Sequence, residues 1–199
     1  MRAEMRERPP MFIQTEPTPN PATLKFMPGK TVLGDGTVDF RAKSEARASP
    51  LARRLFDVDG VTGVFLGADF ISVTKGEADE WQHMKPAILG AIMEHYLSGA
   101  PVLDDGPLDD GHLGDGGENY DAKDEETVRA IKELLDTRVR PAVANDGGDI
   151  VFHGFKDGIV FLHMRGACSG CPSSTATLRH GIENLLKHFC PDVQEVRPV

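Results

Sequence analysis

The stretch from residue 99 to 122 constrains the fold more than any other part of this 199-residue chain. Its 24 residues contain six glycines, two prolines and seven acidic side chains, without one lysine or arginine. Such a segment buries too little apolar surface to offset the entropy cost of ordering it. We therefore expect an acidic, flexible linker, with an acidic recruitment motif as the alternative. It would join two small domains, residues 11–98 and 123–199, with a flexible N-terminus at 1–10.

The remaining charge is almost balanced, which excludes some partners. Residues 1–98 contain 12 lysines and arginines and 13 aspartates and glutamates. Residues 123–199 contain 10 basic and 11 acidic side chains. Neither domain has the basic stripe that neutralises phosphates, so no nucleic acid is expected. No apolar run is long enough to span a membrane. Residues 1–10 resemble neither a secretory signal nor a transit peptide, and from this we expect a bacterial cytoplasmic protein.

The first domain is predicted to combine short strands with two helices. Prolines at positions 17, 19 and 21 favour extended backbone before a strand, TLKF. Ser49 is placed to cap a helix that starts at Pro50, and a hairpin follows in VTGVFLGADFISVTKG. A long helix, capped by Asp79, runs to about Ser98. Its apolar face is expected to pack in the core and consists of Trp81, Met84, Ile88, Ile92 and Tyr96.

The second domain reads as helix, hairpin, helix and strand. A helix over 123–137 is followed by Pro141, which makes a break or a new first turn, and then by a sharp turn at NDGG. Two strands, DIVFHGF and GIVFLHM, are joined by the loop 156–158. The helix from Pro172 has apolar positions Leu178, Ile182, Leu185, Leu186 and Phe189, and VQEVRPV forms the last strand. The fold class is therefore α+β, with a short mixed or antiparallel sheet packed by helices in each domain.

Cys168 and Cys171 lie where the second of those strands gives way to the helix. Helix N–H groups and the helix dipole favour a thiolate there, and two thiolates in one loop can hold a metal centre. A thioredoxin-like dithiol oxidoreductase, attacking through Cys168, is one possibility, although the pair follows a hairpin rather than a crossover. A structural zinc site needs four ligands, so it would have to bridge a dimer. An iron-sulfur cluster also takes four thiolates, which two chains supply.

The remaining cysteine and the histidines are weaker candidates. Cys190 lies about 30 Å from the pair if the helix is straight, so we expect it to pack as a small apolar side chain. Packing is also the default expectation for His153, His163, His180 and His188. The sequence places no histidine base beside Cys168, as cysteine protease chemistry would require.

Two segments carry a family resemblance. RPAVANDGGDIVFHGF with GIVFLHMRGACSGCPSSTATLRHGIENLLK resembles the C-terminal domain of NifU, and MFIQTEPTPNPATLKFMPG resembles the Nfu N-terminal domain. The chain is thus similar, over almost its whole length, to the Nfu family of NifU-like iron-sulfur cluster carriers. The resemblance implies that Cys168 and Cys171 bind a labile [4Fe-4S] cluster shared by two subunits of a homodimer. It also implies upstream cluster donors, apo iron-sulfur client proteins and no catalytic turnover.

Overall fold

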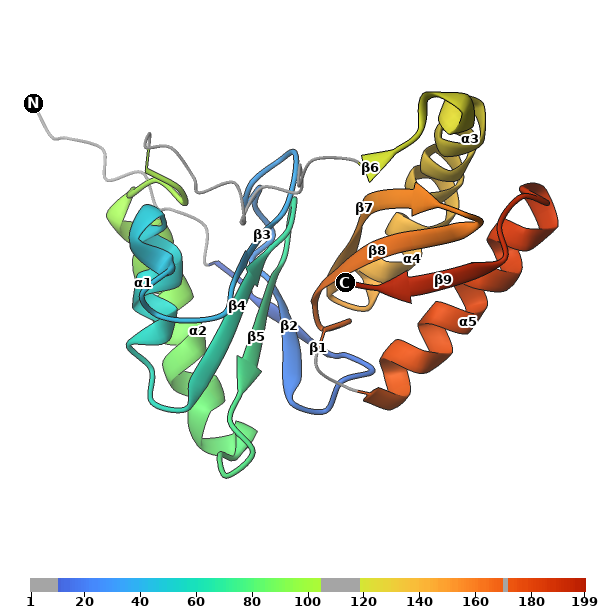
Figure 1. The fold of residues 1–199 in the computed structure, drawn as a ribbon. Coiled ribbons are helices and arrows are strands. Elements are labelled where there is room, and N and C mark those ends of the chain that lie inside the picture. The colour runs from blue at the N-terminus through green and yellow to red at the C-terminus, as the bar shows by residue number, and fades with distance from the viewer. Residues whose placement is uncertain (1–10, 105–118, 170–171) are drawn as a thin grey trace, which may run out of the picture.

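The computed structural model describes residues 11–104, 119–169 and 172–199. It contains two sheets, each packed by helices on one face (Figure 1). The expected α+β class with two domains is therefore confirmed. Most of the expected linker lies outside the described residues. None of the helices in the described part of the chain has the length and apolarity needed to cross a membrane.

The N-terminal sheet is antiparallel throughout, in the order β1-β2-β5-β4-β3. Its strands are β1 (Gln14–Pro17), β2 (Thr23–Met27), β3 (Val38–Phe40), β4 (Val61–Leu66) and β5 (Ile71–Lys75). A 3₁₀ turn, η1 (Ala46–Ala48), precedes the helices α1 (Pro50–Phe56) and α2 (Trp81–Ser98). Alternate strand residues, such as Phe26, Val64 and Val73, share a buried core with Leu55 and Ile88 of the two helices. The period of two along each strand therefore leaves the opposite sheet face for other contacts.

Local signals predicted the start of α1 but not that of α2. Ser49 caps α1 by accepting a hydrogen bond from the amide of Ala52 at 3.0 Å. The predicted cap by Asp79 is wrong: Glu80 holds the cap position and makes no side-chain cap bond. The Asp79 carboxylate lies instead against Gly60, where an added Cβ would come within 2.6 Å of its Cγ.

The apolar face of α2 also differs at its ends. Met84, Ile88 and Ile92 are buried as expected, whereas Trp81 and Tyr96 are only half-buried. A histidine that the sequence pattern did not place in the core, His95, is fully buried. The three-residue strand β3 was also not predicted, because it is too short to show a clear alternation.

The C-terminal sheet is mixed and has the order β6-β7-β8-β9. Its strands are β6 (Asn119–Tyr120), β7 (Gly148–Lys156), β8 (Ile159–Gly166) and β9 (Glu195–Pro198). Only β7 and β8 are antiparallel, and the outer strands run parallel to their neighbours. The loop between β7 and β8 has two residues, Asp157 and Gly158, rather than the predicted three, because Lys156 still belongs to β7. Both loop residues have positive φ, at 49° and 79°. Two positive φ values are typical of a tight hairpin turn with the strand twist.

The helices of this domain are η2 (Ala122–Asp124), α3 (Glu125–Leu134), the π-helical turn η3 (Leu135–Val139), α4 (Arg140–Asn145) and α5 (Pro172–Phe189). Of the two alternatives at Pro141, the structure has the new first turn, because the proline lies at the start of α4. The π turn accommodates the proline, whose ring and missing N–H conflict with regular α-helical bonding. On α5, Ile182 and Leu186 of the apolar stripe enter the core, whereas Phe189 at its end is 47% exposed. Cys190, one residue further along the chain, is in the core instead.

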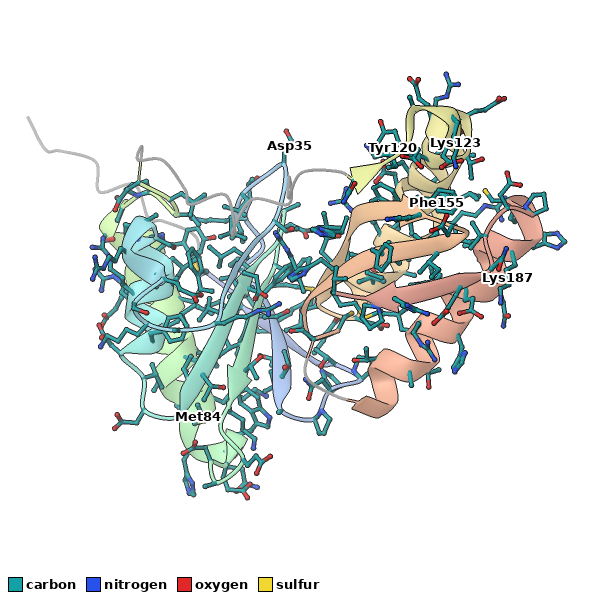
Figure 2. The ribbon with its side chains drawn as sticks, in the orientation of Figure 1. Asp35, Met84, Tyr120, Lys123, Phe155 and Lys187 are labelled. Atoms are coloured by element: carbon teal, nitrogen blue, oxygen red, sulfur yellow. The ribbon has the colours of Figure 1, made fainter. Side chains whose placement is uncertain are left out.

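The two domains pack against each other. Side chains fill the space between the two sheets (Figure 2). The hydroxyl of Ser72, on β5, donates to the carbonyl oxygen of Gly147 at 2.6 Å, and the hydroxyl of Thr37 donates to Asp149 at 2.7 Å. Gly147 lies in the turn before β7, and Asp149 is the second residue of that strand. The face of the N-terminal sheet opposite its helices therefore lies against the part of the C-terminal domain that supports the candidate site.

Candidate functional site

Cys168 is held by a tight turn at the end of β8. Gly166 has a φ of +62°, a left-handed conformation that glycine adopts without steric cost. The amide of Ala167 then donates to the carbonyl oxygen of Gly147 at 3.1 Å, and the amide of Ser169 donates to that of Gly166 at 3.1 Å. The first bond fastens the start of the cysteine loop to the NDGG turn, and the second closes a turn within the loop itself.

The thiol of Cys168 points inward. The residue is 6% exposed and belongs to the core of the C-terminal domain. A Cβ added at Gly148 would lie 2.7 Å from its Sγ, so the thiol packs where only a glycine leaves room. The hydroxyl of Thr175, in the first turns of α5, donates to the Cys168 carbonyl oxygen at 3.0 Å. The loop is therefore anchored on both sides, to the glycine turn and to α5.

Burial, with the nearby carboxylates of Asp146 and Asp149, raises the pKa of Cys168 to about 12. The expectation of a thiolate favoured by the helix dipole is therefore wrong for this conformation. The reason is that the thiol lies among apolar side chains, where losing its proton would leave a charge away from water.

Cys171, the second residue of the predicted pair, lies outside the described residues. In residues 11–104, 119–169 and 172–199, no three His, Cys, Asp or Glu side chains gather in a set that could hold a metal ion. The assignment of Cys168 and Cys171 as ligands stays a prediction.

Cys190 packs as expected. It is 5% exposed, follows the last turn of α5 and lies in the same core as Cys168. Burial, together with Asp192, raises the pKa of its thiol. A neutral, enclosed thiol at the far end of the helix fits a packing role.

Three of the four candidate histidines, His153, His180 and His188, are exposed. The fourth, His163, is half-buried on β8, with its Nε2 3.2 Å from Nη2 of Arg41 in the N-terminal domain. Burial and the charges of Arg165 and Arg41 lower the pKa of His163. The neutral ring is therefore part of the contact between the domains.

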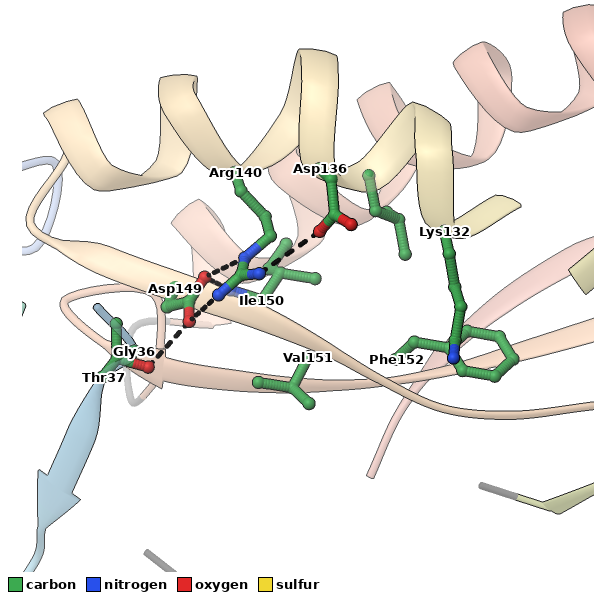
Figure 3. Close-up of a pocket in the computed structure, with 10 residues that line it drawn as sticks. Gly36, Thr37, Lys132, Asp136, Arg140, Asp149, Ile150, Val151 and Phe152 are labelled. Carbon is green, nitrogen blue, oxygen red and sulfur yellow. Dashed lines mark hydrogen bonds and ion pairs between the residues drawn. The ribbon is translucent and has the colours of Figure 1, made fainter. Parts of the chain in front are cut away.

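An ion pair beside the loop was not predicted from the sequence. Arg140 binds Asp149 through two bonds, Nε to Oδ1 at 2.9 Å and Nη2 to Oδ2 at 3.0 Å, and Asp136 approaches the same guanidinium at 3.2 Å (Figure 3). Thr37 and the Ile150 amide also donate to the Asp149 carboxylate. These residues line a cavity of about 350 Å³ between the domains. The only sequence signal was the aspartate that follows the glycine pair.

Comparison with known proteins gives two family matches. The model described as "Scaffold protein Nfu/NifU N terminal" matches residues 13–99, and that described as "NifU-like domain" matches residues 131–197. A mitochondrial NFU1 iron-sulfur cluster scaffold homolog of Drosophila erecta is 50% identical over 204 residues, which cover 100% of this chain and 69% of the relative. The homolog of Drosophila sechellia is 50% identical over 194 residues, covering 95% of this chain and 65% of the relative.

A solved structure also matches. The solution structure of a NifU-like protein from Saccharomyces cerevisiae is 24% identical, with a TM-score of 0.46, and the match covers 53% of this chain and 95% of that one.

These relatives correct one expectation and confirm another. The expected bacterial cytoplasmic location is wrong, because the relatives at 50% identity are named as mitochondrial proteins. The composition of residues 1–10, on which the expectation was based, does not decide the location. The relatives are named as scaffolds rather than enzymes, which confirms the expectation of no catalytic turnover.

Proposed function

Because this chain belongs to the Nfu family of iron-sulfur cluster scaffold proteins, we propose that it carries a [4Fe-4S] cluster as cargo and passes it to apo-proteins. The observation that carries this proposal is the position of Cys168. It lies between β8 and α5 of the NifU-like domain, and a second cysteine follows three residues later. Thiolates in one short loop are typical ligands of iron-sulfur clusters.

The number of thiols supports a cluster shared by two chains. A cubane cluster takes four cysteine ligands, and the loop of one chain contains two. Cys190 packs in the core behind α5, so it is not available as a third. Two copies of the loop, related by a twofold axis, would supply four thiolates. The proposed loaded form is therefore a homodimer.

The buried state of Cys168 has a consequence for loading. Metal ligands must be deprotonated, and the thiol is protonated and enclosed in this conformation. Loading therefore requires that Cys168 turn out of the core and release its proton. A ligand that must move is compatible with a cluster that is held loosely and passed on.

In this conformation, Cys168 is not placed as the attacking thiol of the redox alternative. A dithiol oxidoreductase attacks through an accessible thiolate with a lowered pKa. Cys168 is 6% exposed, and its pKa is raised. The zinc-bridged dimer uses the same four thiolates and is separated from the cluster carrier by experiment.

A transfer assay tests the proposal. The protein is reconstituted anaerobically, freed of excess iron and sulfide, and mixed with an apo-enzyme that needs a [4Fe-4S] cluster. We expect the apo-enzyme to gain activity faster than it does with an equal amount of free iron and sulfide. Equal rates, or a reconstituted protein that is colourless and contains zinc after exposure to both metals, would contradict it.

A further inference from the structure

We propose that the second face of the N-terminal sheet is a docking surface for the two segments of this chain that position Cys168, and that docking holds Cys168 in its buried conformation. We call Lys25, Arg41, Phe65 and Ser72 the docking face. We call two segments together the loop base: residues 145–149, which include the NDGG turn, and residues 163–168, which run from the end of β8 to Cys168. Only the consequence for cluster loading rests on the proposed function.

The docking face follows from strand geometry. Phe26, Val64 and Val73 point toward α1 and α2, so their neighbours Lys25, Phe65 and Ser72 point the other way. On a domain with helices on one side only, the second face would meet water. Here Lys25 is 7% exposed, Phe65 2% and Ser72 1%, because the loop base covers them.

The centre of the contact is the carbonyl oxygen of Gly147. It accepts the Ser72 hydroxyl from the N-terminal domain at 2.6 Å and the Ala167 amide from the cysteine loop at 3.1 Å. A Cβ added at Gly147 would lie 2.7 Å from the Ser72 Oγ, so the two domains touch without a gap. The residue that follows Ala167 is Cys168. A single acceptor thus connects the docking face with the residue next to the thiol.

Two further contacts hold the loop base on either side of this bond. A Cβ added at Gly166 would lie 2.9 Å from Cγ of Phe65, so the aromatic ring is seated on the glycine that turns the chain toward Cys168. The ammonium group of Lys25 donates to the carbonyl oxygen of Asn145 at 3.3 Å. Both glycine turns that position Cys168 are therefore in contact with the N-terminal domain.

At the exposed rim of the contact between the domains, Nη2 of Arg41 lies 3.2 Å from Nε2 of His163 and 3.5 Å from the carbonyl oxygen of Met164. The contacts across the domain boundary are thus mostly single polar bonds around one aromatic ring. Interfaces of that kind between domains of one chain open more readily than apolar cores. Docking therefore holds Cys168 inward reversibly, and undocking frees the loop to meet the loop of a second chain.

The test measures alkylation of Cys168 in the metal-free, full-length protein. Cys171→Ser with Cys190→Ser leaves Cys168 as the only thiol. In this background Lys25→Ala with Ser72→Ala removes two bonds to the loop base. We expect iodoacetamide to modify Cys168 about tenfold faster, since each lost hydrogen bond changes such an opening equilibrium severalfold. The control is Thr62→Ala, whose hydroxyl bonds within the N-terminal sheet at 3.3 Å, and it should leave the rate unchanged.

Equal alkylation rates in the parent and the docking variant would overturn the proposal. Far-UV circular dichroism shows whether the docking variant folds. If it does not, Arg41→Ala decides, because that side chain is 55% exposed at the rim and should still give a faster rate. Alkylation involves no cluster, so a faster rate in a protein that fails to load iron and sulfide would refute the proposed function and leave the docking surface standing.

Discussion

The hydroxyl of Ser72 donates a 2.6 Å hydrogen bond to the carbonyl oxygen of Gly147, across the boundary between the two domains. Gly147 has a φ of +79° and precedes the glycine on which the Cys168 thiol packs. The position of the N-terminal domain is therefore coupled to the backbone that shapes the cysteine loop.

Gly147→Ala should be destabilising. A Cβ there would require an unfavourable positive φ and would lie 2.7 Å from Ser72 Oγ. We expect a loss of about 1–2 kcal/mol in the free energy of unfolding, measured in urea. The matched control is Gly90→Ala within α2, where an added Cβ meets nothing within 4 Å. That change should stabilise by about 0.5–1 kcal/mol, and the same sign for both variants would contradict the prediction.

Asp149→Ala should cost about 2–3 kcal/mol of stability, because it leaves Arg140, the Thr37 hydroxyl and the Ile150 amide without their shared acceptor. The Asp149 side chain is only 5% exposed. The control is Asp136→Ala, which removes the other carboxylate on Arg140, at a site 61% exposed, and should change stability by less than about 0.5 kcal/mol. Chemical denaturation measures the free energy of unfolding of both variants. Equal losses would contradict the prediction, because they would show that the buried bonds of Asp149 stabilise the fold no more than the exposed ion pair of Asp136.

His95 should make the fold sensitive to acid. Burial, and then the charge of Arg54, lower its pKa from 6.5, and neither ring nitrogen has a partner among the described residues. The unfolded chain therefore binds more protons than the native one below pH 6.5. Stability should be constant with respect to this group above that pH and fall as the pH drops toward the native pKa.

Denaturation at about pH 7.5 and pH 5 measures this acid loss, using the ordinary histidine pKa as the reference. His95→Leu should reduce the loss, since it removes the group that must remain uncharged in the core. His153→Asn, at an exposed position, serves as the control and should leave the loss unchanged. An identical pH dependence in His95→Leu and the parent would refute the role of His95.

Cysteine substitutions should separate ligands from packing residues. Cys168→Ser and Cys171→Ser should each abolish the cluster absorbance after anaerobic reconstitution, because either change leaves only two of the four thiolates of the proposed shared site. Cys190→Ser should retain the absorbance and lose only stability, as the thiol is buried in the core. Loss of the cluster in Cys190→Ser, with the fold intact by circular dichroism, would overturn the assignment.

Local sequence signals predicted much of the fold. The Ser49 cap, a hairpin after DIVFHGF and the apolar stripe through Ile88 depend on residues close in sequence, and the structure has all three, although the hairpin loop is one residue shorter than the predicted 156–158. The inward thiol of Cys168 and the burial of Lys25 were not predictable in this way. Both depend on contacts between segments far apart in the chain, such as the contact of β5 with the NDGG turn.

The same limit applies to the candidate site. The position of Cys168 at the strand–helix junction followed from the hydrophobic pattern around it. The protonated state of the Cys168 thiol did not follow from the sequence, because the helix dipole was the only effect on its pKa that the sequence indicated. Burial, which is the main cause of the raised pKa of Cys168, and the nearby charge of Asp146 arise only once the chain is folded.

Iron content and molecular mass, measured together after anaerobic reconstitution, test the shared cluster most directly. We expect roughly two irons and two sulfides per chain, on a dimer that reverts toward the metal-free mass when the cluster is removed, because four thiolates from two chains hold one cubane. Roughly four irons per chain on a monomer would contradict the shared site.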